Sequence, residues 1–514
     1  MPLLIVLAAW FGAVALVLPT EAMPLFDDWV YSRAAMSLAG QGILDLPEWS
    51  AVYPLFQVVW GALFLHLPLV PELALRLSTL VLSLAGSLCW YAALRRRGLT
   101  ADAAAVAVAL VLFNPVYFLL SVTFMTDVVF LALCQMAFAA LVLWSRDKSA
   151  GWFALVLTTV LAASFTRQLG LALVVGLAVA AFAGRRPLQA AVAVASAATV
   201  VAGQLIFSTE VGGGLPLTNR FIDLLAVFSV SPGLYIDGLA VAAAFAGLSL
   251  APLVVRGGRL KPRILLLTLA GLLVVVFVWE TPLLREGQVL GACDLGGARS
   301  LLSGRPPVCP WQGAAGLAAF SLACLGLAGL VPVVAERLRK LYARPAADPV
   351  AAGVAVSALL LVAGMTALWL LADRYWLVPA LLAAPLLAGS VSQRRTLRLG
   401  ASVLLVCYAL VGVAGASSAF SMYRRVNVLA DGLQADGVES RMIDGGYAVN
   451  GRRIYLALPR APRDQGRNAG VAWVSGLVAL PFTIANSVEE GWQKTGRGDS
   501  KPPFVVRPAG LAER

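Results

Sequence analysis

Residues 1 to 28 read MPLLIVLAAWFGAVALVLPTEAMPLFDD, an uncharged apolar run that ends at Pro19 and is soon followed by the adjacent acids Asp27 and Asp28. A run of this length and composition predicts a helix that crosses the roughly 30 Å hydrocarbon core of a bilayer. It has no basic start and no small-residue cleavage site, so we expect a retained span and not a cleaved signal peptide. Carboxylates that border hydrocarbon are costly, and the acid pair therefore indicates a working site.

The whole chain has the composition of an integral membrane protein. Of its 514 residues 60% are hydrophobic and only 13% are charged, and the mean hydropathy is +0.84. No ordinary water-soluble domain of this size has such a balance. We predict an all-α polytopic membrane protein with about thirteen transmembrane helices, each a mostly uncharged run of about 20 residues. The expected spans are 2 to 19, 71 to 94, 101 to 121, 127 to 144, 151 to 166, 168 to 183, 188 to 207, 236 to 255, 264 to 280, 314 to 335, 350 to 371, 374 to 391 and 399 to 420.

Lysine and arginine are distributed unevenly between alternate connections. One set, which includes Arg95, Arg185 and Arg339, carries more than twice as many as the other, which includes Arg33 and Arg299. The richer set is expected on the cytoplasmic side, which places the N-terminus inside and, with an odd number of spans, the C-terminus outside. These anchors account for most of the net charge of +12, so the charge calls for no nucleic-acid partner. We expect a multi-pass protein of the plasma (inner) membrane.

The material outside the membrane is concentrated in two places. Residues 20 to 70 form the long first exterior segment of the 1 to 420 core, and their Trp and Tyr content predicts short amphipathic helices at the interface. Residues 421 to 514 regain charge and contain turn signals, which predict a small exterior (periplasmic) α/β domain. A further span at 470 to 488 is the alternative there. Cytoplasmic connections are mostly short, so an active site is expected outside.

Cysteine and histidine usage excludes some chemistry. His66 is the only histidine, and no cluster of potential ligands has metal-site spacing, so we expect no metal. Cys293 and Cys309 share one expected exterior loop, where an oxidising compartment would allow a disulfide between them; the unpaired alternative stays open.

A series of short polar motifs interrupts the apolar core. They are Phe26-Asp27-Asp28-Trp29-Val30-Tyr31-Ser32-Arg33, Gly40-Gln41-Gly42, Leu75-Arg76-Leu77-Ser78, Asn114-Pro115, Phe124-Met125-Thr126-Asp127, Thr166-Arg167-Gln168 and Asp373-Arg374-Tyr375-Trp376. Over roughly residues 1 to 420 their order and spacing resemble the GT-C glycosyltransferases. More narrowly, they are similar to the family-39-like group of protein mannosyltransferases, aminoarabinose transferases of lipid A and rhizobial galacturonosyltransferases. The resemblance implies a GT-C type fold, an acidic pair in the first exterior loop and a polyprenyl-phosphate-linked monosaccharide as donor.

The acids suit a general base. An acceptor hydroxyl that attacks an anomeric carbon must lose a proton, and a partly desolvated carboxylate can take it. Asp27 or Asp28 is the candidate base, and Asp127 is a further catalytic candidate at the start of another span. The alternative is that these acids cap helices, since Asp is favoured at N-caps.

Arginine is the residue expected to hold the donor phosphate, because its planar fork donates paired hydrogen bonds to phosphate oxygens. Snorkelling to the interface is the alternative role. The arginines at the expected outer level are Arg33, Arg76, Arg167 and Arg374. Three aromatic residues are weaker candidates for substrate contact, with membrane-belt residues as the alternative: Trp29, Trp49 and Tyr53.

The sequence therefore predicts an inverting glycosyltransferase that moves one sugar from a polyprenyl-phosphate carrier to a glycan, lipid or protein acceptor on the outer face, without a cofactor. One alternative is a transporter or flippase of lipid-linked saccharides, but transporters commonly show repeated halves, and no such repeat is present. A non-catalytic subunit of an envelope polysaccharide assembly is another alternative. Such a subunit would not need acids and arginines at one level.

Overall fold

The structure is a computed structural model that describes residues 1–23, 25–46, 50, 52–210, 246–247, 249–252, 254, 314–367, 373–382, 395–445, 447–453, 482–485, 492–494 and 504–508. Its helices are α1 (Pro2–Val17), α2 (Asp28–Gln41), α3 (Leu55–Phe64), α4 (Pro71–Arg96), α5 (Ala101–Leu112), α6 (Pro115–Ser121), α7 (Thr126–Asp147), α8 (Ala150–Ser164), η1 (Gln168–Gly170), α9 (Leu171–Ala183), α10 (Pro187–Glu210), α15 (Ala314–Ala343), η2 (Pro345–Ala347), α16 (Pro349–Ala367), α17 (Asp373–Leu382), α19 (Arg395–Ala435), η3 (Ser440–Met442) and α20 (Tyr447–Arg453). Its strands are β1 (Ile443–Asp444), β2 (Phe482–Ala485), β3 (Trp492–Lys494) and β4 (Phe504–Pro508).

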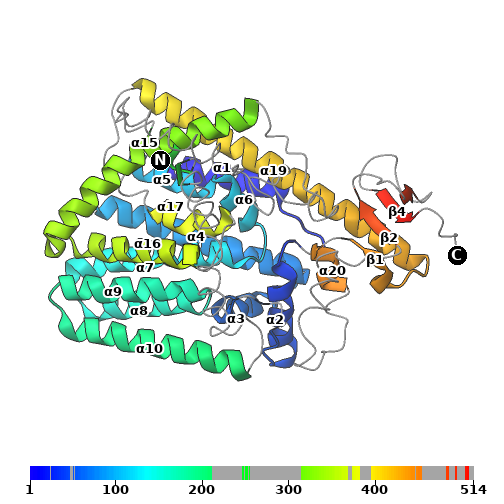
Figure 1. Ribbon diagram of the computed structural model, residues 1–514, viewed down its shortest axis with the longest axis horizontal. Helices are drawn as coiled ribbons and strands as arrows, with labels where there is room; N and C mark the ends of the chain where they lie inside the picture. Colours follow the sequence, from blue (N-terminus) through cyan, green and yellow to red (C-terminus); the bar gives the residue numbers. More distant parts are fainter. Residues whose placement is uncertain are drawn as a thin grey trace.

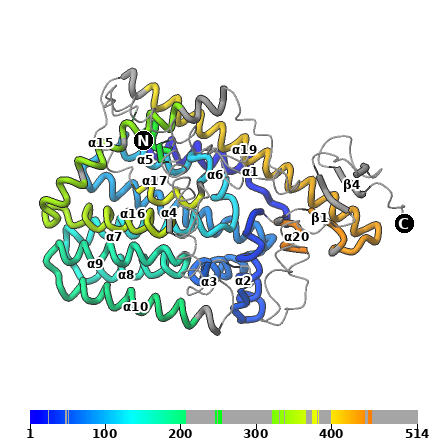
Figure 2. Tube along the Cα trace, in the orientation of Figure 1, coloured from blue at the N-terminus to red at the C-terminus, as the bar shows by residue number. Residues whose placement is uncertain are grey.

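The long helices pack in layers around α7, which is the most deeply buried of them. Helix α7 contacts α4 on one side and α8 on the other, while α9 lies against α10 and α16 (Figure 1). The same stacking of α8, α9 and α10 is visible along the Cα trace in Figure 2. Of the most apolar 18-residue window of α7, 83% is buried inside the protein. A helix that is apolar on every side is expected in the interior of a membrane bundle.

Five described helices are long and apolar enough to cross a membrane, and the bent pair α5 and α6 gives a sixth if it counts as one span. The described core is thus that of an all-helical, multi-span membrane protein. Helices α1, α8, α9 and α16 fall on predicted spans but are shorter apolar helices. The total of about thirteen spans stays a prediction, since 264 to 280 and most of 236 to 255 lie outside the described residues.

The predicted span 101 to 121 corresponds to a bent pair of helices. Helix α5 ends at Leu112, and α6 starts at Pro115 at an angle of 66° to it. Pro115 cannot donate a backbone hydrogen bond, and the residue before a proline is pushed out of the helical region. Asn114 occupies this break and caps α6, because its Oδ1 accepts hydrogen bonds from the backbone N–H groups of Val116 and Tyr117 at 3.1 and 3.3 Å.

Residues 20 to 70, the predicted first exterior segment, contain the two short helices α2 and α3, which lie across one end of the bundle (Figure 1). Helix α2 ends at Gly42, whose φ of +69° is a left-handed conformation that favours glycine. Helix α3 is tied to the neighbouring span ends: Phe56 N donates to Phe165 O at 3.0 Å, and Gln57 Nε2 donates to Phe124 O at 2.8 Å. These bonds hold α3 against the ends of α7 and α8.

Helix α19 continues past residue 420 to Ala435, so residue 421, the predicted start of the C-terminal region, lies inside it. Beyond α19 lie α20 and a four-stranded sheet of order β1-β2-β4-β3, in which β1 and β2 are parallel and the other pairs are antiparallel. A second small apolar cluster, which includes Val426, Leu433 and Ile443, joins α19 to this region.

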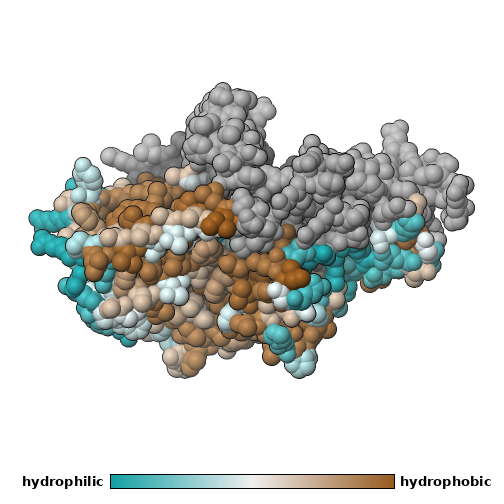
Figure 3. Space-filling model, turned by 90° about the horizontal axis from the view of Figure 1, so that it is seen from below, coloured by the Kyte–Doolittle hydropathy of each residue, from teal (hydrophilic) through white to brown (hydrophobic). Residues whose placement is uncertain are grey.

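The surface agrees with a membrane setting. In Figure 3 apolar residues cover the middle of the face shown, and hydrophilic residues gather at its two ends. Large exposed hydrophobic side chains include Leu188 and Ile206 of α10 and Leu399 and Leu410 of α19. An apolar surface of this extent is expected where lipid, and not water, is the solvent.

Candidate active site

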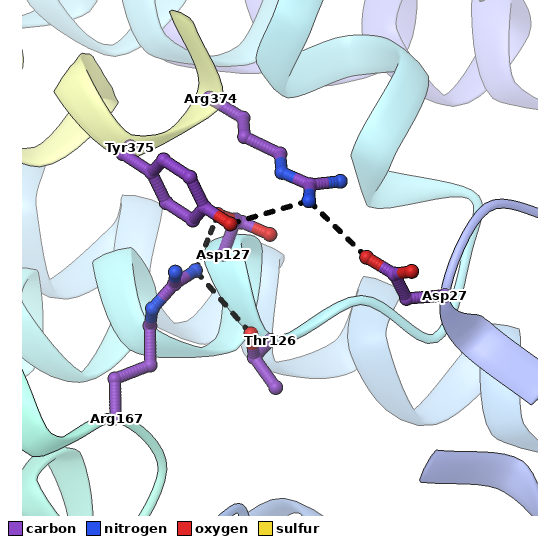
Figure 4. A network of polar contacts seen from close by, with 6 residues as sticks. All are labelled: Asp27, Thr126, Asp127, Arg167, Arg374 and Tyr375. Atoms are coloured by element: carbon purple, nitrogen blue, oxygen red, sulfur yellow. Dashed lines mark hydrogen bonds and ion pairs between the residues drawn. The ribbon is translucent and has the colours of Figure 1, made fainter. Parts of the chain in front are cut away.

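A small polar cavity lies where the segment of residues 20 to 70 meets the ends of three other segments. Its volume is about 180 Å³. The polar side chains that line it come from α2, α7, the α8–η1 connection and α17: Asp27, Tyr31, Thr126, Asp127, Arg167, Arg374 and Tyr375. Figure 4 shows six of them pointing toward one another. Residues from four distant parts of the sequence therefore form one charged site.

Local structure explains how each element presents its charge. Asp127 is in the first turn of α7, where the helix dipole favours a carboxylate. Arg167 precedes η1 in an extended conformation, with φ −146° and ψ 136°, at the point where the chain leaves α8. Arg374 stands in the first turn of α17. All three positions lie at helix ends and not within the long apolar runs of the helices.

The charges form two ion pairs. Arg374 Nη2 donates to Asp27 Oδ2 at 3.1 Å, with the two side chains 19% and 22% exposed. Arg167 Nη1 donates to Asp127 Oδ1 and, at 3.3 Å, to Thr126 Oγ1. The side chains of Arg167 and Asp127 are only 8% and 3% exposed. The Arg167–Asp127 pair is thus the more deeply buried of the two. The Arg374–Asp27 pair is the one that an incoming ligand can reach.

Tyr375 connects the two pairs. The guanidinium carbons of Arg167 and Arg374 lie 4.8 and 5.1 Å from the centroid of its ring, within the range of cation–π contact. Arg374 Nη2 also donates to the Tyr375 hydroxyl at 3.3 Å. Neither Tyr375 nor Thr126 was predicted as a site residue. Both lie within motifs that were predicted for their charged neighbours, so adjacency to Arg374 and Asp127 was the signal that pointed to them.

The structure separates the two adjacent acids. Asp27 faces the cavity, while Asp28 turns away from it, is 4% exposed, and accepts a hydrogen bond from Leu25 N at Oδ1 over 2.7 Å. Burial raises the pKa of Asp28 to about 7, against the opposing effect of the Arg76 guanidinium. Burial likewise raises the pKa of the Tyr31 phenol, and the nearby Asp27 carboxylate adds to the rise.

Arg76 holds the chain that follows α1. Its side chain is buried, and its Nη groups donate to three backbone oxygens: Pro19 O at 2.7 Å, Glu21 O at 3.0 Å and Met23 O at 2.8 Å. It does not line the charged cavity. Its Nη donors thus hold the chain that leads into Asp27. Because it also lies outside the charged cavity, Arg76 is a structural clamp and not a candidate phosphate ligand.

Arg33 and Trp29 lie on the opposite side of α2 from the charged cavity. Both line a second cavity of about 520 Å³, which also contains Asp28, Glu72 and Arg452. Arg33 is half exposed and lies 3.6 Å from Asp45. Their helical spacing explains the separation, since positions 29 and 33 share a face of α2 that differs from the face of 27, 30 and 31.

The remaining predicted residues contribute little to the charged cavity. Tyr53 is buried, with 2% of its surface exposed, and does not line it. Trp49, Cys293 and Cys309 lie outside the described residues. Within the described ranges no group of three or more His, Cys, Asp or Glu side chains is arranged to hold a metal ion.

Comparison with known proteins gives only structural similarity. No protein-family model and no curated protein matches this sequence. The structure is similar to ArnT from Cupriavidus metallidurans bound to undecaprenyl phosphate, with 14% identity and a TM-score of 0.49 over 100% of this chain and 98% of that chain. ArnT from the same organism in the apo state is 14% identical with a TM-score of 0.45, over 86% of this chain and 79% of that chain.

The archaeal oligosaccharyltransferase AglB from Archaeoglobus fulgidus, solved with an inhibitory peptide and a dolichol-phosphate, is also similar. It is 14% identical with a TM-score of 0.41, over 85% of this chain and 59% of that chain. The likeness to these GT-C membrane glycosyltransferases is one of overall structure at low identity. At TM-scores below 0.5 it assigns neither an activity nor a substrate, and the narrower family-39-like group stays a prediction.

Proposed function

We propose that the protein is an inverting, membrane-embedded glycosyltransferase that moves a monosaccharide from a polyprenyl-phosphate carrier to an acceptor hydroxyl at the outer face. The observation that carries the proposal is the cavity itself. In it an accessible carboxylate, Asp27, stands beside two guanidiniums, those of Arg374 and Arg167. A base for the acceptor and cations for an anionic leaving group are the two requirements of this reaction.

Asp27 is the proposed general base. The acceptor oxygen forms a bond to the anomeric carbon, and its proton passes to the Asp27 carboxylate as the bond from that carbon to the phosphate oxygen breaks. Asp27 is the more exposed of the two carboxylates in the cavity, at 22% against 3% for Asp127. A base must reach the proton that it removes, which favours Asp27. Asp127 then acts by fixing the position of Arg167.

Arg374 and Arg167 are the proposed ligands of the lipid phosphate. The bond electrons leave with the polyprenyl phosphate, which gains negative charge and needs fixed positive charge nearby. In the described structure the two arginines are balanced by two aspartates, so the site is formally neutral when it is empty. A bound phosphate would accept hydrogen bonds from the same guanidinium groups that now donate to these carboxylates. The ion pair between Arg374 and Asp27 would then weaken, which leaves the Asp27 carboxylate available to accept the proton of the acceptor hydroxyl.

Transfer by the purified protein alone is the direct test. The protein is incubated in detergent with a polyprenyl-phosphate-linked radiolabelled monosaccharide and with candidate glycan, lipid or peptide acceptors. Labelled product and free polyprenyl phosphate should appear together, with inversion at the anomeric carbon. Failure to release polyprenyl phosphate with any donor, although the donor binds, would overturn the proposal. Uptake of intact donor into sealed vesicles without bond cleavage would indicate transport instead.

The proposal places this cavity outside the cytoplasm, with residues 1 to 420 as the membrane core and 421 to 514 as a periplasmic region. The excess of basic residues in the opposite connections supports this orientation. Reporter fusions after Arg97 and after Arg425 should report opposite compartments. If both report the same compartment, the site is not on the outer face.

A further inference from the structure

A third cavity lies at the other end of α7, away from the charged cavity that contains Asp127. It has a volume of about 390 Å³ and is lined by the end of α7, the end of α9 and the chain before α16. The 22 residues of α7 span about 33 Å at 1.5 Å per residue, close to the thickness of a bilayer core. The two cavities therefore lie at opposite membrane surfaces.

The chemistry of this cavity is that of an anion site. Lys148, Arg185 and Arg186 line it, and none of its described lining residues is acidic. Two acids are adjacent in sequence to the lining residues: Asp147, which precedes Lys148 and is exposed, and Asp348, whose carboxylate pairs with Arg97 and caps α16. Three cations that share one concave surface attract anions much more strongly than the same cations spread over a convex surface.

Backbone strain is concentrated at the same place. Of the three described non-glycine residues with positive φ, two line this cavity: Lys148 at 52° and Arg185 at 57°. Glycine or Asn is usual where a helix ends in this left-handed conformation, and a long side chain there costs roughly 1 kcal/mol. Lys148 directly follows α7 and Arg185 lies two residues after α9, so two strained cations line the same cavity. Strain of this kind is typically retained at binding sites.

A buried donor is also present. Trp144 lines the cavity and is 2% exposed, and its indole Nε1 has no hydrogen-bond partner among the described residues. An unsatisfied buried N–H is costly, and an acceptor placed beside it removes that cost. An anion with several oxygens, such as a phosphate group, would supply that acceptor together with the partners for the three cations.

The surroundings favour a lipid over a free ion. Phe182 at the end of α9 and Leu188 at the start of α10 are each 77% exposed and lie three residues before Arg185 and two residues after Arg186. Apolar side chains that flank a basic pocket at a membrane surface provide room for acyl chains beside a charged headgroup. We propose that this cavity binds the phosphate headgroup of an anionic phospholipid in the leaflet opposite the transfer site.

Lipid binding to the purified protein tests this proposal. The protein in neutral detergent is titrated with phosphatidylglycerol or with phosphatidylcholine of the same acyl chains, and bound lipid is counted by native mass spectrometry. Phosphatidylglycerol should bind more tightly than phosphatidylcholine, and the triple variant Lys148→Gln, Arg185→Gln, Arg186→Gln should lower its affinity roughly 10- to 100-fold. Trp144→Phe keeps the ring but removes the N–H, and should lower that affinity a few-fold.

The matched control removes the same charge from outside the cavity: Arg95→Gln, Arg96→Gln, Arg344→Gln. This control should retain the affinity of the unchanged protein for phosphatidylglycerol. Equal losses in both triple variants would mean that only net charge matters and would overturn the site. So would equal affinity for the two lipids. If millimolar inorganic phosphate displaces the lipid completely, the cavity is a site for free phosphate and the lipid assignment is wrong. The readout is binding and not sugar transfer, so its outcome is separate from the test of the proposed function.

Discussion

Replacing Asp27 with Asn should abolish most of the turnover and leave the fold intact. A positioned general base contributes roughly 10² to 10⁴ in rate, or about 2.7 to 5.5 kcal/mol of transition-state stabilisation. The structural cost is much smaller, because the Asp27–Arg374 pair is about one-fifth exposed. An ion pair that is partly solvated is worth at most about 1 kcal/mol. The variant should therefore lose kcat far more than it loses thermal stability.

Asp28→Asn is the matched control for this experiment, since it makes the same chemical change one residue away. The side chain of Asp28 points away from the cavity, and its Oδ1 accepts from Leu25 N at 2.7 Å. Asn keeps that acceptor oxygen and removes only the charge, which burial already disfavours by raising the pKa of Asp28 to about 7. We expect turnover within about threefold of the unchanged protein, well below the effect of a general base.

The assay follows release of labelled sugar from a polyprenyl-phosphate donor at saturating acceptor, with kcat and KM determined for both variants and unfolding temperatures measured in the same detergent. Asp27→Asn should show a selective loss of kcat. Normal turnover in Asp27→Asn, or an equal loss of kcat in the two variants while both stay folded, would exclude Asp27 as the sole general base. Equal loss would mean that the acidic pair acts together and that the direction of each side chain is not what decides the chemistry.

Three further predictions concern the neighbouring charges. Arg374→Lys and Arg167→Lys should each raise KM for the donor roughly 10- to 100-fold if a bidentate phosphate contact is lost. The control Arg95→Lys, at the far end of α4, should leave KM unchanged. If all three variants have the KM of the unchanged protein, bidentate phosphate binding by Arg374 and Arg167 is excluded. Asp127→Asn should lower the unfolding free energy by roughly 3 to 5 kcal/mol, because it leaves the buried Arg167 uncompensated, and an unchanged unfolding temperature would contradict this. The raised pKa of Asp28 means that the folded protein binds an extra proton between the ordinary pKa of about 4 and about 7. The stability that this group contributes is full below that window and is lost as pH rises through it. Asp28→Asn should therefore reduce the fall in unfolding temperature between pH 4 and 7. Equal slopes of unfolding temperature against pH in both proteins would contradict a raised pKa at Asp28.

That the chain is a membrane protein could be predicted from the sequence, because a long uncharged apolar run is expected where lipid surrounds a helix. Uncharged stretches near Val128 and Val192 fall in the helices α7 and α10, both of which are long enough to span. The break at Asn114 could not be read from hydropathy, since the apolar run continues through it. Only the missing N–H of Pro115 marks it, and proline is often tolerated inside membrane helices.

The convergence of the site residues was predictable in part. Asp27, Asp127, Arg167 and Arg374 all stand at span ends, and ends on one side of a membrane share one level. Level alone does not fix direction around a helix axis, however. Arg33 and Arg76 stand at the same predicted level, and the structure places Arg33 in a different cavity and Arg76 on the backbone of residues 19 to 23. Their directions depend on tertiary packing, which no local pattern encodes.

The clearest case is the choice between the two adjacent acids, which depends on a turn that distant residues hold. Phe26 has a φ of 53°, a conformation that costs an aromatic residue on the order of 1 to 3 kcal/mol. Tyr423 of α19 meets the Phe26 ring edge-on at 5.9 Å. Arg76 holds the preceding residues through three hydrogen bonds, each worth roughly 1.5 to 3 kcal/mol when the donor is charged. These contacts are strong enough to offset the strain at Phe26. The direction of Asp27 into the cavity is therefore set from α4 and α19, which is why inspection of residues 26 to 28 alone could not assign the base.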